Sequence, residues 1–150
     1  MKTFYVASYG KGDDKGIYIV SFNEETLELK KIQQILTQDF PSYLIAKNKE
    51  LYVSYKNARS NNEGGGLGSF SIHKNELILN NNYSSSGRSY THLCISDDNK
   101  YIFAANYHVG ATAAYKLENY RIDHKIGAVR HTGMGPDFAT PWKIREAAIY

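Results

Sequence analysis

The sequence predicts an all-β fold, a partial β-propeller of about three four-stranded antiparallel blades, and two observations lead to this prediction. Aromatic and β-branched residues are frequent, including 13 tyrosines and 6 phenylalanines, and clusters of Gly, Asn, Asp and Ser separate them. Strands favour the first group and turns the second. In addition, strand-like segments recur in the same order at intervals of roughly fifty residues, which is the length of a propeller repeat.

Each repeat opens with a short apolar strand that has an aromatic residue at its second position. The three strands align Tyr5, Tyr52 and Phe103. A glycine-containing loop and a second strand follow each time, at residues 16–22, 66–72 and 110–117. The second strand contains a small residue followed by an aromatic one, and this pair aligns Phe22, Phe70 and Tyr115.

A third strand and a hairpin complete the repeat. Third strands are expected at residues 26–31 and 76–81, and hairpins at residues 41–55 and 90–106. The polar stretch Ser96–Lys100 is typical of a solvent-facing turn, and we expect the second hairpin to join one blade to the next.

Four antiparallel strands per repeat are typical of a propeller blade. A β-sandwich is the alternative, but it gives no reason for the strand types to recur in order. A propeller ring needs about four to eight blades, so three blades would leave it open. We expect residues 1–137 to form the partial propeller and residues 138–150 an atypical tail, in which the segment after Pro141 favours a short helix.

Composition argues against several classes of function. The net charge is +3 and the lysines are scattered, whereas a nucleic-acid surface clusters its charge with aromatic residues. Cys94 is the single cysteine, which fits a reducing compartment. We find neither a signal-peptide pattern nor an apolar run of membrane-spanning length. The sequence therefore predicts a cytoplasmic protein with no nucleic-acid or membrane partner.

Several segments together resemble a known family. They are YVASYG with GIYIVSF, the element YTHLCISDDNKYIFAANYHVG and the stretch HTGMGPD, and they lie in order between Thr3 and Asp137. The chain resembles the lactonase-type propellers, the family of bacterial 6-phosphogluconolactonases and fungal 3-carboxy-cis,cis-muconate lactonizing enzymes. The resemblance implies a seven-bladed ring, of which this chain would be an N-terminal fragment of about two and a half blades. The tail after Asp137 departs from the family pattern. It resembles the product of a frameshift or a premature stop.

The resemblance also implies an activity. Intact relatives would hydrolyse 6-phosphogluconolactone to 6-phosphogluconate, a step of the pentose phosphate pathway, without a cofactor. The small-molecule partner would be an anionic sugar lactone. Most catalytic positions of the family map beyond residue 150, so we expect this chain to be inactive alone. An open propeller has exposed blade edges, and we expect the chain to self-associate through them. The alternative is a non-enzymatic binding module, in which copies of the chain form an oligomeric ring.

Opening a lactone requires a base to activate water, donors for the carbonyl oxygen and cations for the phosphate. His131, in a glycine-rich stretch, is the candidate catalytic residue because a histidine titrates near neutral pH. Arginine binds oxyanions through its planar guanidinium. The candidate substrate-binding residues are Arg88, His92, Asn106, Tyr107 and Arg130.

Two of these candidates have a second interpretation. His92 and Asn106 either line the funnel or hold the scaffold around it. His92 and Cys94 alternate onto one strand face, but a metal site needs a further close pair of ligands, and the sequence has none. We therefore expect no metal.

Overall fold

The computed structural model describes residues 1–9, 13, 15–35, 40–56, 65–74, 76–85 and 89–132, and the regular elements of these ranges are β-strands. They are β1 (Lys2–Tyr9), β2 (Lys15–Asn23), β3 (Glu28–Ile35), β4 (Pro41–Lys47), β5 (Glu50–Lys56), β6 (Gly65–His73), β7 (Glu76–Ser85), β8 (His92–Ile95), β9 (Tyr101–Asn106), β10 (Ala111–Glu118) and β11 (Arg121–Arg130). The predicted all-β class is confirmed.

The strands form three antiparallel sheets, which we call blades one, two and three. Blade one contains β1, β2 and β3, blade two runs in the order β4-β5-β6-β7, and blade three in the order β8-β9-β10-β11. The partial propeller is therefore confirmed, with one blade of three strands and two of four.

The expectation that the hairpin of residues 90–106 joins two blades is wrong. Its strands β8 and β9 pair with each other, Leu93 opposite Ala104 and Ile95 opposite Ile102, and both belong to blade three. A short turn between two strands brings them together as antiparallel neighbours in one sheet. Within the turn, the Ser96 hydroxyl donates to Asp98 over 2.7 Å, and this bond holds the pKa of the Asp98 carboxyl below its usual value.

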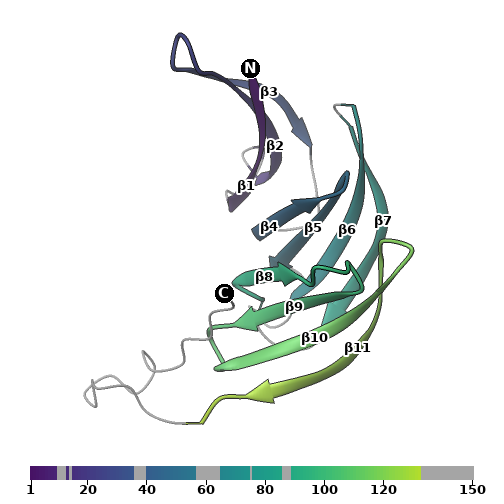
Figure 1. Cartoon of the computed structure of the whole chain (residues 1–150). Helices are drawn as coiled ribbons and strands as arrows, with labels where there is room; N and C mark the ends of the chain where they lie inside the picture. Colours follow the sequence, from purple (N-terminus) through teal and green to yellow (C-terminus); the bar gives the residue numbers. More distant parts are fainter. Residues whose placement is uncertain are drawn as a thin grey trace, which may run out of the picture.

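The blades fan out from a common inner side (Figure 1). β1, β4 and β8 lie nearest this side, where β4 contacts both β1 and β8, while β7 contacts β11 farther out. We call β4 and β8 the inner strands. The inner side of the fan is where a complete ring would have its central channel.

The junction of blades two and three holds the larger core. Tyr52 and Leu67 of blade two pack there against apolar side chains of blade three, including Leu93 and Ile102. Tyr115 is fully buried, with the rings of Tyr83 and Tyr90 edge-on at 5.0 and 6.0 Å. Burial and the hydrogen bond between the Tyr90 and Tyr115 hydroxyls raise the pKa of Tyr115.

Hydrogen bonds of polar side chains also join blades two and three. The Ser54 hydroxyl donates to the Tyr90 carbonyl over 2.9 Å, and the Ser42 hydroxyl reaches the same carbonyl at 3.0 Å. Farther out, Asn81 of β7 forms two hydrogen bonds with the backbone of Ile122 in β11. These bonds satisfy groups that would be costly to bury unpaired.

The junction of blades one and two has a smaller core. It contains Ile17, Leu51, Val53 and Phe70, with Tyr5 packed at its margin. Blade one therefore has one face on this core, and its far face carries Phe4 and Val6, which are 46% and 45% exposed.

Candidate functional site

Two ring side chains meet where the inner strands lie side by side. Tyr43 on β4 and His92 at the start of β8 have ring centroids 4.6 Å apart, with a tilt of 50° between the planes. Both side chains are half-buried. We call this pair the inner rim, because it lies where the two inner strands β4 and β8 meet.

The two nitrogens of His92 lie in different surroundings. Nδ1 is buried and has no hydrogen-bond partner among the described residues. An imidazole can leave one nitrogen unprotonated as an acceptor, and an unpaired acceptor costs less than an unpaired buried donor. An imidazole with a proton on Nε2 and none on Nδ1 would leave only an acceptor unpaired, and its Nε2–H would be available as a hydrogen-bond donor.

The turn after β9 lies beside the inner rim. Thr91, which precedes His92, donates its amide to the Ala105 carbonyl over 2.8 Å, and its hydroxyl accepts from the Tyr107 amide at 3.4 Å. Asn106 is buried, and its side-chain oxygen accepts the His108 amide at 3.1 Å. This local bond is a turn motif typical of asparagine. His92, Asn106 and Tyr107 are thus brought to one end of blade three.

His131 and Arg130 lie at the opposite side of the same sheet. Arg130 is paired with Ala111, which in turn faces Asn106, so β10 and β9 separate Arg130 from the inner strand β8. The three strand spacings between β11, which carries Arg130, and β8 correspond to about 14 Å. His131 is exposed; its amide donates to the Gly110 carbonyl over 2.7 Å, and its Nε2 lies 3.1 Å from the Thr112 hydroxyl. The described part of the chain does not place His131 or Arg130 at the inner rim.

Arg88 and the tail beyond Thr132 lie outside the described residues. Within the described ranges, no three His, Cys, Asp or Glu side chains gather as metal ligands would. Cys94 is a half-buried free thiol. The same ranges contain no helix long and apolar enough to cross a membrane.

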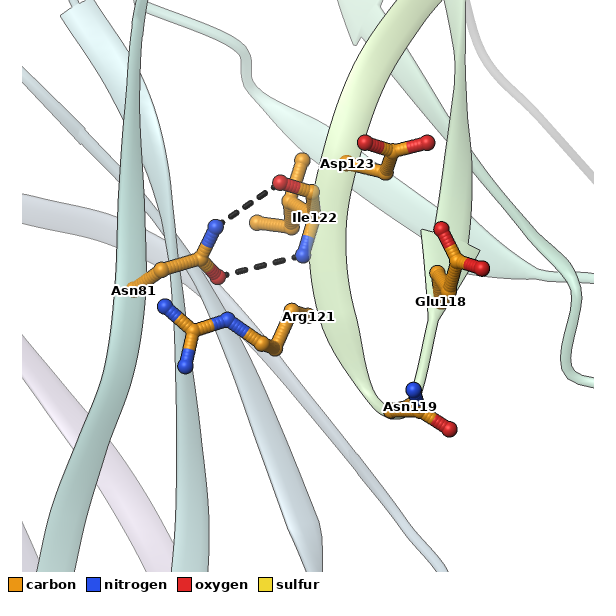
Figure 2. A pocket seen from close by; sticks show the side chains of 6 residues that line it. All are labelled: Asn81, Glu118, Asn119, Arg121, Ile122 and Asp123. Carbon is orange, nitrogen blue, oxygen red and sulfur yellow. Dashed lines mark hydrogen bonds between the residues drawn. The ribbon is translucent and has the colours of Figure 1, made fainter.

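A shallow groove lies at the outer strands (Figure 2). It has a volume of about 320 Å³ and is lined by Asn81, Glu118, Asn119, Arg121, Ile122 and Asp123. Figure 2 shows Asn81 reaching from β7 to the backbone of Ile122, while Glu118 and Asp123 lie on the other side of the groove. The groove is remote from the inner rim, and its lining combines both signs of charge.

Tyr43 is the site residue that sequence reasoning missed. The alignment of the two hairpins pairs Leu44 with Leu93, which also pairs Tyr43 with His92. The repeat itself therefore contained the signal: equivalent positions of adjacent inner strands carry ring side chains.

The chain matches known proteins over most of its length. Residues 3–141 match the lactonase family model, described as a 7-bladed β-propeller. The 6-phosphogluconolactonase of Bacillus subtilis is 30% identical over 135 residues, which are 88% of this chain and 38% of that protein. A solved structure from Bacteroides fragilis, of a candidate 6-phosphogluconolactonase, has a TM-score of 0.75 at 27% identity and covers 91% of this chain and 38% of that one.

A second solved structure, the periplasmic gluconolactonase of Pseudomonas aeruginosa, has a TM-score of 0.70 at 19% identity, covers 86% of this chain and 38% of that one, and shows likeness of fold alone. This chain thus spans about 38% of the length of the curated relatives it matches first. The repeated blades and the family match together show that the chain belongs to the lactonase family of seven-bladed β-propellers.

Proposed function

We propose that this chain forms part of a lactone-hydrolysing propeller of the 6-phosphogluconolactonase type, and that its inner rim is one wall of the lactone site. The substrate is an anionic sugar lactone, and the reaction uses neither a redox cofactor nor a metal. We further propose a cytoplasmic location, as the sequence predicts.

The observation that carries this proposal is the contact between Tyr43 and His92 on the inner strands β4 and β8, whose ring centroids are 4.6 Å apart. An Nε2–H of His92 would donate to the lactone carbonyl as it gains charge, which is how positioned donors accelerate acyl transfer. The Tyr43 ring would hold the imidazole in place and offer an apolar surface to the sugar. Asn106 and Tyr107 follow at the same end of blade three.

The described rim lacks parts that hydrolysis needs. Arg130 lies about 14 Å away across the sheet, by the usual strand spacing, so the rim has no nearby guanidinium from this position. Nδ1 of His92 has no hydrogen-bond partner among the described residues, so no carboxylate orients the ring through that nitrogen. We therefore propose that the isolated chain does not hydrolyse the lactone, and that further blades complete the site.

A chimera tests this proposal. The 135 residues of the Bacillus subtilis 6-phosphogluconolactonase that match this chain are replaced by the matching residues of this chain. We expect the chimera to hydrolyse 6-phosphogluconolactone above the spontaneous rate, and His92→Ala in it to lower kcat/KM by roughly 100-fold, the usual effect of losing one such donor. The isolated chain serves as the inactive reference.

Controls separate chemistry from folding. Circular dichroism and thermal melting establish that each chimera is folded, and His124→Ala changes an exposed histidine of β11 without expected effect. A folded chimera without activity, or full activity after His92→Ala, would contradict the assigned role. Turnover by the isolated chain would contradict the proposed need for further blades.

The ring-forming binding module remains a second proposal, and the exposed far face of blade one favours it. Phe4 and Val6 are 46% and 45% exposed there, together with Leu29 at 68%. Copies that associate through this face would form one discrete oligomer. Light scattering on the eluting protein measures its mass, and a monomer at all concentrations would exclude the ring.

A further inference from the structure

Lys56 is the last residue of β5, at the end of blade two where Tyr43 lies. Tyr43 on β4 pairs with Ser54, which precedes Lys56 by two residues. Two residues in this relation are diagonal neighbours of an antiparallel strand pair, about 7–8 Å apart at Cα and within reach of a long side chain. Tyr43 of the inner rim therefore has a lysine as a close neighbour.

The side chain of Lys56 lies on the face of blade two that is directed at blade three. Side chains alternate between the two faces of a strand, and Ser54, on the same face as Lys56, donates its hydroxyl to the Tyr90 carbonyl just before β8. Gly65 pairs with Lys56 and gives the same direction, since a Cβ at Gly65 would lie 2.7 Å from the Ser89 Cα. Lys56 is half-buried, and its side chain projects beside the segment that leads into β8.

We call the end of blades two and three at which β4 and β8 begin the rim end. Within the described ranges, the acidic residues of these blades all lie at the opposite end, where the hairpin turns are: Glu50, Glu76, Asp97, Asp98, Glu118 and Asp123. Lys47, the last residue of β4, is also at that opposite end and donates to the Ser96 carbonyl over 3.0 Å. An anion at the rim end thus meets the positive charge of Lys56 without opposition from a described carboxylate of these blades.

A propeller blade does not itself require a lysine at this position. The alignment of the three repeats makes Tyr9 of blade one and Tyr107 of blade three the counterparts of Lys56. The positive charge is therefore particular to blade two, which also provides Tyr43. Arg130, predicted from the sequence to bind substrate, lies on the far side of blade three.

We propose that Lys56 binds the phosphate of the lactone and so selects the phosphorylated substrate; this inference rests on the proposed function of the inner rim. The carbonyl and the phosphate of 6-phosphogluconolactone lie at opposite ends of its carbon chain. Because Tyr43 adjoins both His92 and Lys56, a sugar resting on its ring presents the carbonyl to the imidazole and the phosphate to the ammonium. Hydrogen bonds from an ammonium to a phosphate are charge-assisted and strong. Lys56 is thus a specificity-determining residue, and no bond to the phosphate forms or breaks.

Substrate preference in the chimera tests this role. The measured quantity is the ratio of kcat/KM for 6-phosphogluconolactone to kcat/KM for gluconolactone, the same lactone without the phosphate. Lys56→Gln should lower this ratio roughly 10- to 100-fold, the usual effect of losing a hydrogen bond to a charged group. Lys56→Arg should keep most of the ratio, because a guanidinium also binds phosphate. A purely structural role would change both lactones alike and leave the ratio as it was.

Lys49→Gln is the matched control. It removes the same charge from an exposed residue of the turn between β4 and β5, at the end of the strands away from Lys56. We expect it to leave the ratio unchanged.

A binding experiment on the isolated chain needs neither catalysis nor the chimera. Ligand-observed NMR measures the affinity of the chain for the product 6-phosphogluconate and for gluconate. We expect 6-phosphogluconate to bind roughly 10-fold more tightly, and Lys56→Gln to remove this difference. An unchanged ratio in an active Lys56→Gln chimera, or equal binding of the two acids by the unaltered chain, would overturn the role of Lys56. An inactive chimera together with Lys56-dependent binding of 6-phosphogluconate would instead contradict the proposed hydrolysis alone.

Discussion

Asn81 offers a direct test of how blades two and three are joined. Its side-chain amide donates to the Ile122 carbonyl at 2.8 Å and accepts the Ile122 amide at 3.1 Å, as a neighbouring strand would (Figure 2). It also accepts the Ser69 hydroxyl at 2.7 Å. Asn81→Ala removes all three hydrogen bonds and leaves the backbone groups of the buried Ile122 without partners.

The expected cost follows from the number of bonds. A neutral hydrogen bond contributes about 0.5–1.5 kcal/mol, so losing the two bonds to Ile122 should lower the free energy of unfolding by about 2 kcal/mol. For a chain of this size, that corresponds to a Tm lower by roughly 4–8 °C. Asn81→Asp should not restore stability, since a carboxylate cannot donate to the Ile122 carbonyl and repels it.

Urea titration followed by near-ultraviolet circular dichroism measures these changes, because the buried tyrosines Tyr83, Tyr90 and Tyr115 report on the same junction. Glu118→Gln alters an exposed residue of the same groove and should change stability by less than about 0.5 kcal/mol. A loss below that value for Asn81→Ala, or full stability of Asn81→Asp, would refute the role of this amide.

Further predictions concern tyrosine ionisation and strand packing. Burial and the nearby Glu50 raise the pKa of Tyr52 to about 12, so the folded state keeps a proton that the unfolded chain loses near pH 10. Stability should fall as the pH rises from about 10 to 12, and Tyr52→Phe should reduce that fall by about 1–2 kcal/mol, allowing for screening, in urea titrations at each pH. A Cβ at Gly65 would lie 2.7 Å from the Ser89 Cα, so Gly65→Ala should cost about 1–3 kcal/mol in thermal melts. Gly127→Ala is the matched control, because its Cβ meets no atom within 4 Å and it should be neutral or slightly stabilising. Leu93→Ala should cost about 2–5 kcal/mol, since Leu93 is 1% exposed in the larger core, and an unchanged unfolding midpoint would contradict that core assignment.

The sequence was sufficient to predict most of the strands, because alternation and turn residues act over a few neighbours. The third strand of the last repeat, β11, was not among the predicted segments. The sequence did not define how strands group into blades, since the repeat has no marked beginning. The four-strand unit read from Tyr5 onward is offset by one strand from the sheets, in which β4 and β8 come first. The aligned Phe22 illustrates the same limit: Val20, not Phe22, pairs with Phe4 in the way that Phe70 pairs with Leu51.

Part of the candidate site was predictable, because those residues lie close together in the sequence. His92, Asn106 and Tyr107 were identified from one contiguous segment, and the structure brings them to one end of blade three. Tyr43 comes from another blade, and its nearness to His92 depends on how β4 and β8 face each other. His131 follows the outermost strand β11, so the sheet order places it on the side of blade three away from the inner rim. Its catalytic role stays a prediction, as does substrate binding by Arg88 and Arg130.

The two junctions differ in a way that bears on function. The inner rim rests on the larger core, where Tyr115 is fully buried and Ser54 and Asn81 hydrogen-bond across the blades. A site whose side chains are fixed by such packing needs little reorganisation when a ligand arrives. Blade one has a smaller core and exposes Phe4 and Val6 on its far face, and among the described residues β1 pairs with β2 alone. The pair of Tyr43 and His92 therefore lies on the better packed of the two blade junctions.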